Sequence, residues 1–355
     1  MGHFSARRRD VHCSENHIAS EERPLGDFQE LVDLAAERLG GAAVWATDEF
    51  FAPKENLLRP GRGIFVPDKY TEHGKWMDGW ESRRRRTPGH DYCVIRLGFS
   101  GVIRGVDVDT NHFLGNAPQA CSLEACRLEG FPSSAALLGR EVRWTEVLQS
   151  SALKPGSQNL FEISSPEAWS HVRLHIYPDG GVARFRVYGE VMPDWHRILA
   201  EHRVIDLAAV AHGGRILSAS DAFFSDRRNL IMPGRSLNMA DGWETRRRRG
   251  PGHDWVILQL GRPGELTRVE VDTTHFKGNF PESCSLEGCL TADGSLESRA
   301  DWKEILPRSP LGAHSQHLFE RELLDVGPIS HARLNIYPDG GIARLRLFGE
   351  PSQAR

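Results

Sequence analysis

The chain has 355 residues, 39% of them hydrophobic and 26% charged, so it is long enough for two domains with buried cores. Acidic residues outnumber basic ones by 48 to 44, which argues against the broad basic surface of a nucleic-acid-binding protein. We find neither an apolar run near the ~20 residues that span a bilayer nor the apolar core of a secretory signal. Six cysteines without a CxxC pair suit reduced thiols, so we expect a cytoplasmic protein that binds neither nucleic acid nor membrane.

An internal repeat organises the sequence. In chain order, DLAAERLGG (33–41) returns as DLAAVAHGG (206–214), DGWESRRRR (78–86) as DGWETRRRR (241–249), VDTNHFLGN (108–116) as VDTTHFKGN (271–279), CSLEAC (121–126) as CSLEGC (284–289), and IYPDGGVARFRVYGE (176–190) as IYPDGGIARLRLFGE (336–350). A period of about 160 residues is too long for a solenoid unit and predicts two whole domains. We expect a flexible tail at 1–24, domains at 25–192 and 201–351, and a linker at 193–200.

Each copy contains mainly strand patterns. The segment 33–41 has helical spacing and ends in Gly-Gly, which predicts one short helix or an irregular lead-in. The segment 171–177, HVRLHIY, alternates apolar and polar residues, Pro-Asp-Gly-Gly supplies a turn, and VARFRVYG follows, so we expect a hairpin. Many short strands separated by turns predict an all-β fold of two tandem β-sandwich domains.

The arginine quartet at 83–86 allows more than one interpretation. If it is a strand, Arg83 and Arg85 face one way, and Arg84 and Arg86 face the other. A solvated strand neutralised by neighbouring acids is the commoner outcome of such a charge run. Alternatively, one or two guanidiniums in a cleft can bind a carboxylate through paired hydrogen bonds. The quartet by itself does not choose between these two roles.

Other polar residues recur at equivalent places in both copies. A histidine beside a carboxylate can transfer protons or hold a divalent metal, although turn capping is the commoner role for any single residue of this kind. In CSLEAC the strand pattern directs the two cysteines to opposite faces and the glutamate to the more polar one. The first copy supplies His90, Asp109, His112 and Glu124, and the second supplies His253, Asp272, His275 and Glu287.

These long, ordered and doubled motifs resemble those of the allantoicase family from about Asp27 to Glu350. The resemblance implies two jelly-roll domains, similar to galactose-binding modules, in a self-associating enzyme of purine breakdown. It further implies hydrolysis of allantoate to (S)-ureidoglycolate and urea. The first copy also carries a longer segment, RPGRGIFVPDKYTEHGKWMDGW, at 59–80.

Allantoate carries a carboxylate and two ureido groups on one carbon, so its hydrolysis needs an anion clamp, ureide-binding groups and proton donors and acceptors. Urea can leave by direct displacement or through a transient acylimine that then adds water. The residues predicted to move protons are Asp109, His112, Glu124, Asp272, His275 and Glu287. Those predicted to bind substrate are Arg83, Arg85, His90, Asn116, Arg184, Arg246, Arg248, His253, Asn279 and Arg344.

No cofactor is assigned, and a divalent metal at the paired His and Asp residues is left open. The alternative function is a non-catalytic tandem β-sandwich that binds carbohydrate or small anions. Trp76 would then belong to an exposed aromatic site, whereas Trp80 and Trp243 are expected to pack in the cores.

Overall fold

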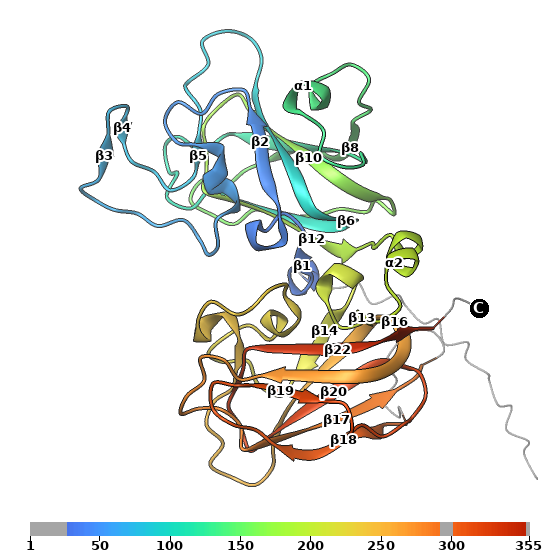
Figure 1. The fold of residues 1–355 in the computed structure, drawn as a ribbon. Helices are drawn as coiled ribbons and strands as arrows, with labels where there is room; N and C mark the ends of the chain where they lie inside the picture. The colour runs from blue at the N-terminus through green and yellow to red at the C-terminus, as the bar shows by residue number, and fades with distance from the viewer. Residues whose placement is uncertain (1–26, 292–300, 353–355) are drawn as a thin grey trace, which may run out of the picture.

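The computed structural model describes residues 27–291 and 301–352 and contains two β-sandwiches, one per repeat (Figure 1). The predicted all-β fold of two tandem sandwiches is therefore confirmed. Trp80 and Trp243 are fully buried at equivalent places in the two cores, as expected. The tail expected at 1–24 lies outside the described residues. Within the described ranges, no helix is long and apolar enough to cross a membrane.

One long, bent strand belongs to both layers of the first sandwich. The first half of β6 (Asp91–Asp109) pairs with β2 and β10, and its second half pairs with β12 and β9. The larger layer contains β2 (Ala42–Ala46), β6, β10 (Ala168–Tyr177), β7 (Ala120–Cys126) and β8 (Thr145–Ala152). The smaller layer contains β9 (Leu160–Glu162), β6, β12 (Arg184–Val191) and β1 (Val32–Asp33). The shorter elements are η1 (Asp27–Glu30), η2 (Glu37–Leu39), η3 (Lys54–Leu58), β3 (Tyr70–Thr71), β4 (Gly74–Lys75), β5 (Trp80–Glu81), α1 (Ser134–Leu137) and β11 (Gly181–Val182).

The second sandwich repeats this topology around β16 (Asp254–Asp272). Its larger layer contains β14 (Arg215–Ala219), β16, β20 (Ile329–Tyr337), β17 (Ser283–Cys289) and β18 (Lys303–Pro310). Its smaller layer contains β19 (Gln316–Phe319), β16, β22 (Arg344–Pro351) and β13 (Ile205–Asp206). The shorter elements are η4 (Val210–His212), η5 (Arg227–Ile231), η6 (Met239–Asp241), β15 (Trp243–Glu244) and β21 (Gly341–Ile342).

The predicted hairpin across Pro178–Gly181 is wrong. Strands β10 and β12 pair with opposite halves of β6 instead of with each other, so the chain between them crosses from one layer to the other. The Asp91 amide donates to the Pro178 carbonyl, and the Ala183 amide donates to the Asp109 carbonyl. Because only a few residues separate these contacts, both ends of β6 lie at the same end of the sandwich.

A buried phenylalanine explains the glycines in this crossing. The ring of Phe113 is fully buried against the crossing, and a Cβ atom on Gly181 would lie 2.0 Å from its Cε1 atom. Gly180 adopts a φ of 135°, which disfavours any residue with a side chain. Phe276 and Gly341 reproduce this contact in the second repeat. The crossing is thus a packed element that fixes the loops around it.

One further local prediction needs correction. The arginine quartet is not a strand, because β5 ends at Glu81 and the Arg85 amide donates to the side chain of Asp179 instead of to a strand neighbour. There a contact to a distant part of the chain overrides the local pattern. The segment 33–41 forms the short 3₁₀ turn η2, which ends where Gly40 adopts a φ of 94°, in agreement with the expected short helix or irregular lead-in.

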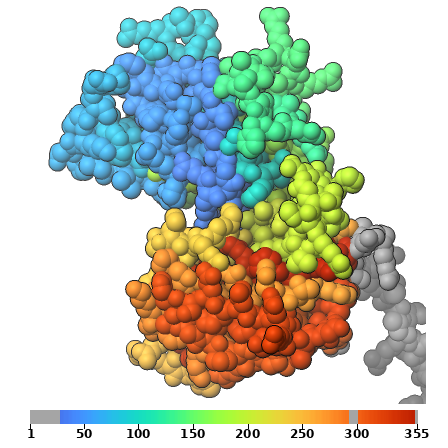
Figure 2. Space-filling view, in the orientation of Figure 1, coloured from blue at the N-terminus to red at the C-terminus, as the bar shows by residue number. Residues whose placement is uncertain are grey.

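The two lobes meet through side chains of both repeats, as Figure 2 shows for the blue-to-green and yellow-to-red halves. Leu39 of the first repeat is part of the second hydrophobic core. The segment expected as a linker at 193–200 contains most of α2 (Trp195–Glu201), and its Trp195 and Ile198 pack against the same core. The junction is therefore an ordered interface.

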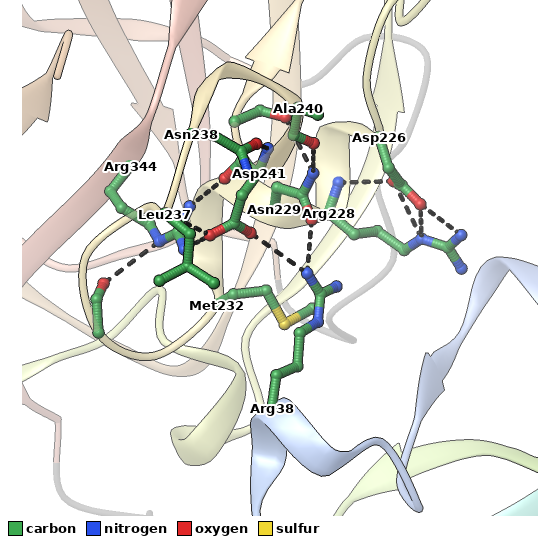
Figure 3. Close-up of polar contacts among 12 residues, drawn as sticks. Arg38, Asp226, Arg228, Asn229, Met232, Leu237, Asn238, Ala240, Asp241 and Arg344 are labelled. Atoms are coloured by element: carbon green, nitrogen blue, oxygen red, sulfur yellow. Dashed lines mark hydrogen bonds and ion pairs between the residues drawn. The ribbon is translucent and has the colours of Figure 1, made fainter. Parts of the chain in front are cut away.

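A cavity of about 780 Å³, lined by both apolar and charged residues, lies at this junction. Figure 3 shows Arg38 of the first repeat reaching the side chains of Asn229, at 2.7 Å, and Asp241, at 3.5 Å, in the second. Arg228 is held by Asp226 and by two backbone carbonyls, and Arg344 is held by Asp241. The hydrogen bonds of Arg38 and Arg228 therefore link the two repeats beside the cavity.

We predict that Gly181→Ala destabilises the protein by about 1–3 kcal/mol, because the new methyl group overlaps the Phe113 ring in a packed core. Urea unfolding followed by tryptophan fluorescence measures the change. Gly115→Ala is the matched control, since a Cβ atom there meets no atom within 4 Å. Equal stability of the two variants would contradict the packing role given to the crossing.

Candidate functional site

The outer face of the larger layer in the first repeat collects several of the predicted polar residues. Along β10, Val172, Leu174 and Ile176 are buried in the core, so the alternating Arg173 and His175 point to the other face of the sheet. The register pairs Arg173 with Glu124 and His175 with Ser122 on β7. Strand alternation thus gathers carboxylate, guanidinium and imidazole groups on one surface.

Three of these side chains form a hydrogen-bonded chain. Nε2 of His175 lies 2.7 Å from Oε2 of Glu124, and Nδ1 of His175 lies 2.8 Å from Nε2 of His90. Glu124 also accepts a hydrogen bond of 2.7 Å from Nε of Arg173. His90 is in place because the next residue, Asp91, begins β6 and is bonded to the crossing.

Aromatic and hydroxyl groups surround the chain. The ring of His90 lies 4.6 Å from that of Tyr177, and the ring of His175 lies 5.3 Å from that of Tyr92. The Tyr177 hydroxyl is 2.9 Å from Oγ of Ser122. These neighbours leave His90 half-buried, with one ring nitrogen, Nδ1, that has no hydrogen-bond partner among the described residues.

The hydrogen bonds define the protonation of the chain at neutral pH. Burial lowers the pKa of His175 and outweighs the opposing effect of the Glu124 carboxylate. Burial also lowers the pKa of His90, and the charge of Arg85 adds to the effect. For Glu124, burial opposes ionisation, but hydrogen bonds from His175 and Arg173 lower the pKa overall.

A neutral His175 that donates from Nε2 to Glu124 must accept at Nδ1, so His90 donates from Nε2. The remaining lone pair is then on Nδ1 of His90. This nitrogen can take a proton, and the resulting positive charge is stabilised through His175 by the Glu124 carboxylate.

The second repeat builds the same face with one change. Glu287 accepts hydrogen bonds from Nε of Arg333, at 2.7 Å, and from Nδ2 of Asn335, at 2.9 Å. Nε2 of His253 lies 3.3 Å from Oδ1 of Asn335. Asn335 thus occupies the place of His175, and an amide links the acid to the outer histidine where the first repeat has an imidazole.

The arginine quartet divides differently from the expectation. Arg83 donates to the Asp48 carboxylate, with its Nε 2.7 Å away, and NH1 of Arg85 is 2.7 Å from Oδ1 of Asp91. The exposed Arg84 and Arg86 form no hydrogen bond or ion pair with any residue of the described ranges. In the second repeat, Arg246 and Arg248 likewise bind Asp221 and Asp254, and Arg247 and Arg249 repeat the unpaired pattern. The guanidiniums available to a ligand are therefore the pair that the sequence analysis did not select.

Arg184 and Arg344 occupy buried structural positions. Arg184 is 4% exposed, and its NH2 is 2.6 Å from Oδ2 of Asp78. Arg344 is 2% exposed and forms the equivalent pair with Asp241, at 2.8 Å. Since both guanidiniums also donate to backbone carbonyls, neither is free to hold a substrate carboxylate.

Asp109 and Asp272 anchor the loops that follow β6 and β16. Arg62 binds Asp109 through two hydrogen bonds of 2.9 Å, and the Asn111 amide donates to the same carboxylate. Asp272 accepts from the Thr274 amide and from Arg235. Both carboxylates are almost completely buried, so the structure favours a loop-fixing role for them.

The remaining predicted residues lie on those loops. His112 and His275 have φ values of 68° and 76°, and the His112 ring lies 5.7 Å from that of Phe65. Nδ2 of Asn116 is 2.7 Å from Oε1 of Glu81, and Asn279 makes the equivalent bond to Glu244. The hydrogen-bonded chain of side chains in the first repeat therefore includes Glu124 and His90, and the one in the second repeat includes Glu287 and His253. Asp109, His112 and their counterparts lie apart from both.

His175, which links Glu124 to His90, was not among the residues predicted from the sequence. Its signal was present in HVRLHIY, where the alternation that directs Leu174 into the core must direct His175 to the face that carries Glu124. The comparison of HVRLHIY with HARLNIY also contains the difference between the repeats at His175 and Asn335. The sequence alone does not show that β10 pairs with β7, and this pairing is what brings His175 next to Glu124.

Neither a metal site nor a reactive thiol is found among the described residues. No group of three or more His, Cys, Asp or Glu side chains that could hold a metal ion occurs there. The five cysteines within the described ranges are buried and free, as expected. Burial raises the pKa of Cys121, Cys126 and Cys284 to about 12, so these thiols stay protonated at neutral pH.

The fold and these faces define a tandem β-sandwich protein whose surface carries acid–base groups and guanidiniums without a partner in the described ranges. Comparisons with known proteins identify the family. The allantoicase repeat matches residues 32–192 and 205–352. A probable allantoicase from Burkholderia pseudomallei is 50% identical over 323 residues, which cover 90% of this chain and 94% of the relative. Another from Photobacterium profundum is 48% identical over 332 residues, which cover 92% of this chain and 98% of the relative.

A solved structure agrees. The crystal structure of allantoicase from Saccharomyces cerevisiae is 36% identical, with a TM-score of 0.76, and the match covers 91% of this chain and 96% of that one. The chain belongs to the allantoicase family and is a hydrolase.

We predict that Asp78→Ala destabilises the protein by about 3–5 kcal/mol, because it leaves the buried Arg184 without its carboxylate. Glu201→Ala removes the partner of the exposed Arg197 and should leave the unfolding free energy almost unchanged, because solvent screens this ion pair. Thermal and urea unfolding of both variants provide the comparison. Equal losses of unfolding free energy in the two variants would contradict the structural role given to the pair of Asp78 and Arg184.

Proposed function

We propose that this member of the allantoicase family hydrolyses allantoate on the outer face of its first repeat, with His90 as the proton-transfer residue. The observation that carries the assignment is the chain Glu124–His175–His90, which ends in a ring nitrogen without a partner among the described residues. Allantoate hydrolysis requires a proton acceptor for water and a donor for the departing urea. A neutral histidine can perform both steps in turn, because the Glu124 carboxylate opposes the lowering of the His90 pKa by burial and Arg85.

In the proposed reaction, Nδ1 of His90 removes a proton from a water that attacks the central carbon of allantoate. A carbon–oxygen bond forms, the bond to one ureido nitrogen breaks with its electron pair on nitrogen, and His90 returns the proton to that nitrogen. Urea leaves, and ureidoglycolate remains. Glu124 and His175 touch neither reactant in this scheme and act as positioning residues, because they fix the tautomer of His90 and stabilise its charged form.

Arg84 and Arg86 are the proposed clamp for the substrate carboxylate. They are exposed, they lie in the loop that leads to His90, and they form no ion pair within the described ranges. The other two arginines of the quartet are already paired with carboxylates, because Asp48 holds Arg83 and Asp91 holds Arg85. Those ion pairs fix the backbone of the loop and leave the alternate guanidiniums for a planar carboxylate.

We also propose a cytoplasmic, self-associating enzyme. The balance of acidic and basic residues and the buried free cysteines support the first part. Exposed aromatic pairs support the second, since Phe223 and Phe224 are 63% and 59% exposed and Phe50 and Phe51 form the matching pair in the first repeat. Light scattering of the purified protein tests self-association, and a mass of a single chain would refute it.

The direct test is urea release from allantoate by the purified protein, with and without chelation and metal restoration. We expect urea and ureidoglycolate in equal amounts, and we expect His90→Ala to lower kcat by about 10²–10⁴-fold through loss of the acid–base group. His202→Ala, an exposed histidine outside the site, is the matched control. Full activity of His90→Ala would remove the residue from the mechanism, and a loss of only half would assign equal turnover to the second repeat.

The pH dependence of turnover tests the neutral state of the chain. Because burial lowers the pKa of His90, its base form persists below the ordinary histidine pKa of about 6.5, and kcat/KM should fall only below that value. In His175→Asn the imidazole is replaced by the amide of the second repeat, so we expect kcat to fall about tenfold or more with little change in KM. An unchanged kcat and pH profile would contradict the positioning role of His175.

A further inference from the structure

We propose that the outer face of the second repeat is a separate, non-catalytic binding site for a small carboxylate that bears a ureido group. The proposal rests on the assignment of catalysis to the first repeat. Two differences between the otherwise matching faces support it. His175 of the first repeat is replaced by Asn335 in the second, and Ser150 is replaced by Arg308.

The matching part of the two faces is extensive. Arg333 binds Glu287 as Arg173 binds Glu124, and Ser285 contacts the hydroxyl of Tyr337, at 3.1 Å, as Ser122 contacts that of Tyr177. The His253 ring lies 4.7 Å from that of Tyr337, which reproduces the 4.6 Å contact of His90. A ligand that binds one face therefore meets most of the same groups on the other.

The first difference removes the ionisable middle member of the chain. Asn335 is 4% exposed, and its amide is bonded to Glu287, Ser285 and His253. An amide does not accept a proton at neutral pH, so it holds His253 in place without transmitting positive charge to Glu287. The face keeps its hydrogen-bonding geometry but loses the imidazole link between the outer histidine and the carboxylate that the proposed reaction uses.

The second difference adds a cation. The strand register pairs Cys121 with Ser151 and Cys284 with Ser309, so Ser150 of the first repeat corresponds to Arg308. The Arg308 guanidinium lies over the Tyr337 ring at 4.2 Å, and its Nε donates to Oγ of Ser283 at 2.7 Å. Its NH2 is 3.8 Å from Glu282, a long contact to an exposed carboxylate.

The side chain of Arg308 is 54% exposed, so it can bind an anion without being uncovered first. A guanidinium fixed over an aromatic ring suits a carboxylate, and the nearby hydroxyl and imidazole groups suit the planar N–H and C=O groups of a ureido group. The ligand class is therefore the one to which both substrate and product of the proposed reaction belong, and the site holds the ligand without turning it over.

The test uses N-carbamoylglycine, which has one carboxylate and one ureido group but no second ureido group to release. Isothermal titration of the full-length protein should give two binding sites per chain. Arg308→Ser, which installs the residue of the first repeat, should weaken one of them by about tenfold or more. Arg308→Lys keeps the charge but loses the fork, and it should weaken the same site by a smaller factor. Arg203→Ser, at an exposed ion pair with Glu350, is the matched control.

Unfolding temperatures equal to that of the unmodified protein would show that both Arg308 variants fold. Identical isotherms for Arg308→Ser and the unmodified protein would overturn the second site, whatever the outcome of the urea assay. Loss of allantoate turnover in Arg308→Ser would also overturn it, because the second repeat would then take part in catalysis. Absence of urea release by the unmodified protein would instead refute the proposed function, and the titration would still report whether one or two sites bind the probe.

Discussion

The crossing between β10 and β12 is the constraint on which the rest of each sandwich depends. It passes from one layer to the other at Gly181 against the ring of Phe113. It also binds the arginine segment through Asp179 and the start of β6 through Pro178. His90 directly precedes β6, so the crossing holds this residue beside the outer face of the sheet. Packing at one buried ring thus determines where a solvent-facing imidazole stands.

Duplication gives the protein an internal comparison of structure and chemistry. The ion pair of a buried arginine is present in both repeats, as Asp78–Arg184 and Asp241–Arg344, and so is the packing of Phe113 and Phe276 against their glycines. The change lies on the outer faces, where an imidazole in one repeat stands in the place of an amide in the other. Residues that maintain the fold are thus shared, and residues that determine protonation differ. This pattern is what a division between turnover and binding requires.

The charge balance of the quartet follows from the same scaffold. Arg83 is paired with Asp48, which follows the end of β2, and Arg85 is paired with Asp91, which the crossing holds at the start of β6. The other two extend from the loop without a described partner. A run of four like charges is therefore tolerated because half of it is paired, and the other half lies in the loop that leads to His90.

The sequence was sufficient for the repeat, the all-β class and the faces of β7, since strand alternation depends only on local periodicity. It placed Glu124 correctly on the polar face opposite the buried Leu123. It failed where the answer depends on which strands pair. HVRLHIY and VARFRVYG look like a hairpin, yet β6 separates them into two layers. The arginine run has the spacing of a strand, yet its backbone bonds to Asp179. His175 was overlooked because its partner Glu124 is distant in the sequence and adjacent only in the sheet.

The measurement that tests the central claim most directly is nitrogen NMR of the imidazole rings of His90 and His175, with His90→Ala and His175→Asn used to assign the signals. At neutral pH, both rings should be neutral and carry their proton on Nε2, and addition of allantoate should perturb Nδ1 of His90. A doubly protonated His90, or a proton on Nδ1 with the lone pair directed at His175, would contradict the account, because no base would then face the substrate.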